Sequence, residues 1–99
     1  MNDSDTHFDE AFARTIHVGN SITDQNEHAD LWDVADGILA GALQFWLYSR
    51  QPCEDKQCDD CSPVATAETR MAQLRRAIEQ FSSQSDYFHS PHDRNAGRA

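Results

Sequence analysis

Apolar positions recur at the three- and four-residue spacing of α-helices in three stretches of the chain. No stretch alternates between apolar and polar residues as a half-buried strand does, and no Asn-Gly hairpin signal occurs. The pattern therefore predicts an all-α fold. We expect one three-helix domain over residues 1–99, because a chain of 99 residues has no room for two independent cores.

The first helix is predicted over residues 7–18. Its apolar residues fall at every fourth position, and they are Phe8, Phe12 and Ile16. Thr6 is a residue type that caps helix N-termini, and Gly19 suits a left-handed stop after the last apolar position. We expect this helix to lie across the other two and cover part of their exposed face.

The second helix, predicted over residues 27–50, has the strongest apolar pattern. One face carries Leu31, Ala35, Ile38, Ala42 and Phe45, and it is widened by Trp32, Leu39, Leu43, Trp46 and Leu47. Asn26 or Thr23 could cap its start. A helix that is apolar over so much of its circumference has to be buried on more than one side. We therefore expect it to be the central helix of the domain or part of an oligomer interface.

The third helix is predicted over residues 63–83, with Ser62 as N-cap and Pro63 in the first helical position. Its apolar residues form a heptad stripe of Val64, Ala67, Met71, Leu74, Ile78 and Phe81. Two long helices joined by the polar connector 51–62 predict an antiparallel helical hairpin. Residues 84–99 show no periodicity and predict an irregular C-terminal tail.

Charge and hydropathy exclude several classes of partner. The net charge of −9 argues against direct nucleic-acid binding and against anionic membranes, because both depend on Lys and Arg. The longest nearly apolar stretch, residues 38–48, is too short to cross a bilayer. The N-terminus is acidic and lacks the basic start and apolar run of an export signal. We expect a cytoplasmic protein with reduced cysteines.

The connector holds all three cysteines of the chain, in the order Cys53-x4-Cys58-x2-Cys61. Cys58 and Cys61 have the spacing of a zinc knuckle, and Cys53 could be a third thiolate ligand. A fourth ligand could come from His89, His92 or His28. The spacing also begins a plant-type iron–sulfur sequence, but the fourth cysteine of that pattern is absent.

Three readings of these cysteines stay open. Reduced thiols in a polar connector rank first, because nothing in the sequence fixes a fourth ligand. A metal site, with zinc as the metal, ranks second. A disulfide or a redox role ranks last, because the four acidic residues among the cysteines disfavour the thiolate form.

The second helix also carries a candidate protein interface. Gly37 and Gly41 lie one turn apart, and each costs roughly 1 kcal/mol of helix propensity relative to Ala, so close packing by another helix would explain them. Trp32, Phe45 and Trp46 add aromatic surface of the kind enriched at interfaces. The packing helix could be the first or third helix of the same chain, and any one of the aromatic residues could simply fill the core. Because their total is large for 99 residues, we expect these five residues to contact a protein partner or a second copy of the chain.

No common catalytic signature is present, and a small helical domain offers little concavity for a substrate. We therefore predict that the protein is not an enzyme and has no catalytic residues. The expected function is that of a small acidic accessory or regulatory protein acting through protein–protein interaction. One alternative is a zinc-binding module using the cysteine loop. Another is an acidic inhibitor that mimics nucleic acid.

Overall fold

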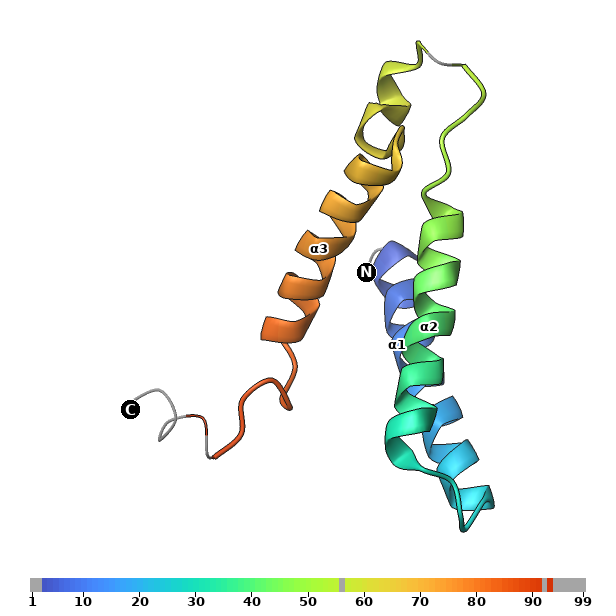
Figure 1. Ribbon diagram of the computed structural model, residues 1–99, viewed down its shortest axis with the longest axis vertical. Coiled ribbons are helices and arrows are strands. Elements are labelled where there is room, and N and C mark those ends of the chain that lie inside the picture. The colour runs from blue at the N-terminus through green and yellow to red at the C-terminus, as the bar shows by residue number, and fades with distance from the viewer. Residues whose placement is uncertain (1–2, 56, 92, 94–99) are drawn as a thin grey trace. The chain divides into compact units, whose positions relative to one another are not determined.

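The computed structural model describes residues 3–55, 57–91 and 93 of the chain (Figure 1). The structure confirms the all-α fold class, with three long helices and a connector that contains the cysteines. The helices are α1 (Asp3–Gln25), α2 (Leu31–Ser49) and α3 (Ala67–Ser83), and a short 3-10 helix, η1 (Asp59–Val64), precedes α3. No strand occurs in the described ranges.

Contacts divide the chain into two units, Met1–Ser49 and Arg50–Ala99. The N-terminal unit holds α1 and α2, which contact each other, and the C-terminal unit holds the connector, η1 and α3. The antiparallel hairpin expected between the second and third helices joins elements from both units, so it stays a prediction. The organisation as a single domain likewise stays a prediction.

The first helix is longer than its predicted span of 7–18, because Gly19 does not end it. No described glycine has a positive φ, and Gly19 continues the helix into a further turn. There the Thr23 hydroxyl donates a hydrogen bond of 3.1 Å to the Gly19 carbonyl. The helix ends at Gln25, where the Asn26 side-chain amide donates to the Ile22 carbonyl at 2.8 Å. That bond satisfies one of the carbonyls a helix C-terminus leaves without a partner.

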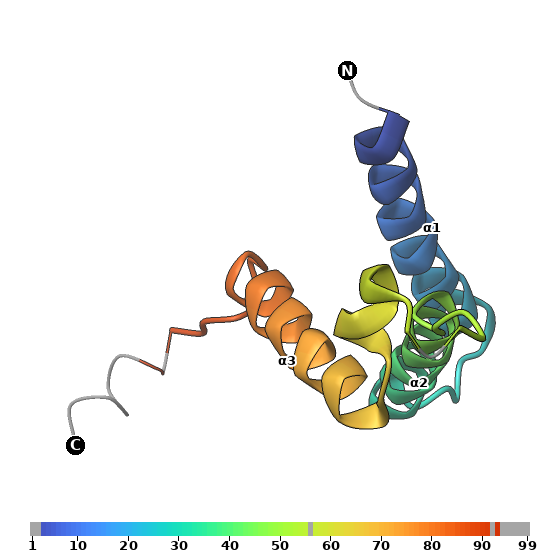
Figure 2. The same ribbon diagram turned by 90° about the horizontal axis from the view of Figure 1, so that it is seen from above.

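Gly19 instead allows α1 to approach α2. A Cβ atom built on Gly19 would lie 2.9 Å from Cδ1 of Ile38, closer than real Cβ contacts come. Figures 1 and 2 show that α1 and α2 meet near the turn at residues 26–30 and diverge away from it. The missing side chain of Gly19 thus makes room for a side chain of α2 at the end where the two helices meet.

The second helix begins at Leu31, four residues after its predicted start, and ends at Ser49. Asp30 caps it: its Oδ1 accepts the Trp32 N–H at 3.1 Å and its carbonyl accepts the Val34 N–H at 3.0 Å. This carboxylate also lies where the helix dipole favours negative charge. The N-terminal cap is therefore Asp30 and neither Asn26 nor Thr23.

The third helix begins at Ala67, four residues after its predicted start, because Thr66 caps it in place of Ser62. The Thr66 hydroxyl accepts the Thr69 N–H at 3.1 Å, and the Thr69 hydroxyl accepts the Thr66 N–H at 3.0 Å. This reciprocal pair is a capping box in which Thr replaces the usual Glu or Gln. Pro63 lies inside η1, and Arg70 Nη1 bonds the Val64 carbonyl at 2.8 Å, which ties η1 to α3.

Very little of the apolar surface is covered. Among the described residues, Leu74 of α3 is the only one that is buried. Its neighbours on the predicted heptad stripe, Met71, Ile78 and Phe81, are each nearly half exposed. Burial on the apolar stripe of α3 is therefore greatest at Leu74, and the stripe residues before and after it remain partly accessible to solvent. In the part of the chain that the structure describes, no helix combines the length and the hydropathy that a membrane span requires.

Candidate functional site

The three cysteines come together in the connector. All three sulfur atoms lie within 4.8 Å of one another. Cys53 lies in the segment that leaves α2, Cys58 precedes η1, and Cys61 lies inside η1. A turn reverses the chain between them, because the Asp55 carbonyl accepts the Cys58 N–H at 3.2 Å and the Asp55 side chain accepts the Gln57 N–H at 3.0 Å.

Hydrogen bonds link the first and last cysteines directly. The Cys53 N–H donates to the Cys61 sulfur at 3.3 Å, and the Cys61 thiol lies 3.5 Å from the Cys53 sulfur. A backbone N–H that donates to sulfur favours the thiolate, because it hydrogen-bonds the charged form. The thiolate is also the form that binds metal ions.

The thiols of Cys58 and Cys61 differ in acidity. The backbone N–H of Cys61, together with the thiols of Cys61 and Cys53, lowers the pKa of Cys58. The backbone N–H of Cys53 favours ionised Cys61, but the neighbouring sulfur atoms of Cys53 and Cys58 outweigh it, and the pKa of Cys61 is raised. Cys58 therefore ionises at a lower pH than an ordinary cysteine, and Cys61 ionises at a higher pH.

The spacing of the sulfur atoms fits one metal ion. Tetrahedral zinc with Zn–S bonds of about 2.3 Å holds its sulfur ligands about 3.8 Å apart. The Cys53–Cys61 pair, at 3.5 Å, is slightly closer than this, and no pair exceeds 4.8 Å. Cys53 is exposed, and Cys58 and Cys61 are partly buried, so an ion can reach the group. The three cysteines could therefore hold a metal ion after small side-chain adjustments.

The structure does not bring His89 to the cysteines. The metal-ligand group found among the described residues consists of the three cysteines alone. His89 lies in the segment beyond the C-terminal end of α3, whereas the cysteines precede its N-terminal end (Figure 1). Its Nδ1 is 3.6 Å from a carboxylate oxygen of Asp93. Its ring packs edge-on against the ring of Phe88, with 4.8 Å between the ring centroids. His92 lies outside the described residues, so a histidine as fourth ligand stays a prediction.

The five residues of the predicted interface all lie on α2. Trp32 and Phe45 are 82% and 72% exposed, and Trp46 is partly buried. A Cβ atom added to Gly37 or Gly41 would meet nothing within 4 Å. Neither glycine therefore serves a close contact within the described chain. Their role at an interface stays a prediction.

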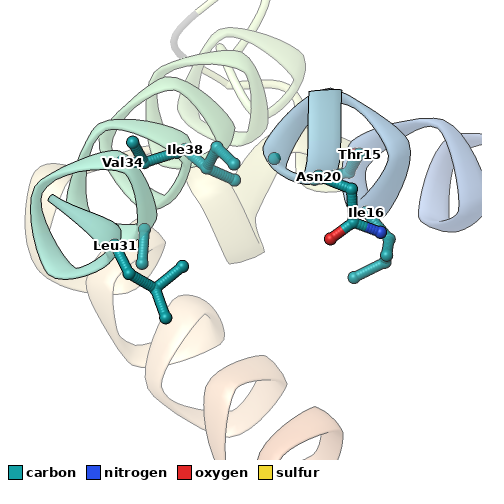
Figure 3. Close-up of a pocket in the computed structure, with 8 residues that line it drawn as sticks. Thr15, Ile16, Asn20, Leu31, Val34 and Ile38 are labelled. Carbon is teal, nitrogen blue, oxygen red and sulfur yellow. The ribbon is translucent and has the colours of Figure 1, made fainter. Parts of the chain in front are cut away.

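The first helix contacts the second, as the sequence pattern led us to expect. Sequence reasoning missed the hollow between α1 and α2. A hollow of about 270 Å³ lies between these helices, lined by Thr15, Ile16, Gly19, Asn20, Leu31, Val34, Ala35 and Ile38. Figure 3 shows Leu31 and Ile38 of α2 arranged around it with Ile16 and Asn20 of α1. Ligand pockets usually enclose roughly 300–1,000 Å³. This hollow is therefore better explained as the point where two diverging helices pack incompletely.

Comparisons with known proteins give no match, whether with protein-family models, with curated proteins or with solved structures.

Proposed function

We propose that this chain is a small acidic accessory protein that acts through protein–protein interaction and catalyses no reaction. The observation that carries the proposal is the exposure of the apolar surface of α2. Its sequence is apolar around most of its circumference, and none of its residues is buried. Only one face of α2 lines the contact with α1, and Trp32, Leu39, Phe45 and Tyr48 remain exposed.

The energetic argument follows from that exposure. Burying one large apolar side chain contributes about 1.5–3 kcal/mol. Ordering one backbone residue costs roughly 1–2 kcal/mol. With Leu74 as the one buried residue of the described ranges, internal burial offsets little of the ordering cost. A second protein surface over α2 supplies the missing burial, so the helices are most stable in a complex.

The charge of the N-terminal unit indicates the chemistry of the partner. Residues 1–49 carry nine Asp or Glu residues and one Arg, and that arginine, Arg14, is bonded to Glu10 at 2.9 Å. Two such units packed together would place like charges side by side. A partner with an apolar patch and a basic rim avoids this repulsion and gains attraction instead. We therefore rank a different protein above the homodimer as the partner.

The variant Gly37→Ala/Gly41→Ala tests this proposal because two readouts should move in opposite directions. Alanine meets no clash in the chain by itself, so helix propensity should raise the stability of α2 by about 1 kcal/mol per site. A partner packed closely against the glycines would be displaced, so its affinity should fall about tenfold or more. The measurements are urea unfolding followed by circular dichroism, and affinity for the partner that purifies with the wild-type chain.

Gln80→Ala is the control, because Gln80 is an exposed residue of α3 and lies outside the predicted interface on α2. It should leave partner affinity unchanged. If the partner binds the wild-type chain and the glycine variant with equal affinity, the glycine face of α2 is not the interface. A folded monomer that retains no partner and does not self-associate would remove the proposal itself. Binding that disappears in high salt, to a partner that also binds nucleic acid, would favour the acidic inhibitor.

A second candidate function, zinc binding, is favoured by the three sulfur atoms within 4.8 Å of one another. Protein purified without added metal should contain about one zinc ion per chain by elemental analysis. Cys58→Ser, which removes one of the three ligands, should contain much less. Protein from the same preparation with Gln57→Ala is the control, because that change leaves all three sulfur atoms in place. Wild-type protein without zinc, even after incubation with the metal and dialysis, would eliminate this candidate.

A further inference from the structure

Resting on the zinc-binding candidate, we propose that the cysteine cluster is a three-thiolate site with an open fourth position, which takes a neutral imidazole nitrogen from outside the chain. Zinc in proteins completes four coordinate bonds, and sites with three protein ligands leave the fourth to water or to an incoming ligand. The described residues bring three donor atoms together here, each of them a cysteine sulfur.

The nearby carboxylates do not supply the fourth bond. Glu54, Asp55, Asp59 and Asp60 are exposed and adjoin the cysteines in sequence, but none belongs to the group of converging donors. The Asp55 side chain instead accepts the Gln57 N–H within the turn. His89 is engaged with Asp93 and Phe88 beyond the far end of α3. Among the described residues no fourth ligand therefore joins the three cysteines, and Cys53 leaves the cluster exposed on its own side.

Charge selects the kind of ligand that can occupy this position. Three thiolates around a divalent ion already leave one negative charge on the site, and the four neighbouring carboxylates add to it. A fourth anion would enter against this field, whereas a neutral imidazole would not. Imidazole nitrogen is also a good zinc ligand. The expected occupant is thus the side chain of a histidine on a binding partner, with water holding the position in its absence.

Cobalt substitution tests the proposal, because Co²⁺ takes the same ligands as zinc and its visible spectrum reports the coordination sphere. The chain loaded with one Co²⁺ should show the intense bands of a tetrahedral thiolate site. Adding free imidazole should shift these bands until one imidazole is bound per cobalt. Azide, an anion, should shift them at least about tenfold less effectively at equal concentration and ionic strength. His89→Gln is the control variant and should give the same spectra as wild type.

The outcomes separate this proposal from the zinc-binding candidate. Stoichiometric cobalt binding with a spectrum that ignores imidazole would show that the site is closed, and would overturn the open position alone. A different cobalt spectrum in His89→Gln would do the same, because it would identify His89 as the fourth ligand. Azide binding as well as imidazole would overturn the argument from charge. A chain that binds neither cobalt nor zinc would remove the metal site altogether.

Discussion

Lowering the pH from 7 to 6 is expected to weaken zinc binding by the cysteine cluster by up to about a thousandfold. An ordinary cysteine thiol has a pKa of about 8.5 and is therefore largely protonated between pH 6 and 7. Each must lose its proton to bind the metal. Three protons released per metal ion correspond to a slope of about three in the logarithm of the affinity against pH.

The acidity differences between the thiols set how this slope changes at higher pH. Because the pKa of Cys58 is lowered, the slope should fall from about three towards two first, as pH rises through that pKa. Because the pKa of Cys61 is raised, the slope should reach zero only above the range of an ordinary cysteine. Zinc affinity should therefore keep increasing into the alkaline range, where the last thiol ionises.

Competition with a chromophoric chelator at several pH values, corrected for the protonation of the chelator, measures this slope. Cys58→Ser is the informative variant: with one thiol fewer, the slope between pH 6 and 7 should fall by about one and the affinity should drop at every pH. A slope close to zero in the wild-type chain would mean that the metal is held by carboxylates, which are already ionised at these pH values.

The sequence predicted the number and type of helices correctly, and it misplaced their ends wherever two capping signals competed. Ser62 and Thr66 are both good caps, but Thr66 has Thr69 three residues later, and this pair forms the capping box. Asp30 likewise acts as the cap of α2 directly before its first apolar residue. A pattern of apolar residues defines a helix face well and its first residue poorly.

Gly19 shows that a glycine near the end of an apolar pattern can either end a helix or allow a second helix to pack closely. Glycine near the end of an apolar pattern usually marks a left-handed stop, but here it lies three residues after Ile16 on the same helix face. Ile22 continues that spacing, and this was the signal that the helix extends beyond residue 19. The contact of Gly19 with Ile38 depends on where α2 packs, and no local pattern contains that information.

For the candidate site, sequence spacing identified the three candidate ligands but not the geometry that brings them together. The pattern of Cys53, Cys58 and Cys61 predicted a group of thiols. Their convergence depends on the turn at Asp55 and on η1, which rest on backbone hydrogen bonds that sequence spacing does not reveal. The predicted fourth ligand, His89, was chosen by residue type alone, and α3 separates its segment from the cluster.

Replacing Leu74 by Ala is expected to destabilise α3 by about 2–3 kcal/mol. Leu74 is only 7% exposed and is the one buried residue in the described part of the chain. Truncation removes apolar contacts that its half-exposed neighbours cannot replace. Helices of this length are marginally stable without tertiary packing, so α3 should open far more often in the variant.

Hydrogen exchange of the α3 amides measures this effect within the helix itself, so it does not require the whole chain to unfold in one step. Protection should fall by about 30-fold to 160-fold, as the expected free-energy change of about 2–3 kcal/mol implies. Leu39→Ala is the matched control, because it removes the same atoms from a residue of α2 that is 55% exposed. The control should change the protection of its own helix by less than about fivefold. Similar losses of amide protection in the two variants would mean that the burial of Leu74 does not stabilise α3 more than an exposed leucine stabilises its helix. The stability of α3 would then come from its capping box and its bond to η1.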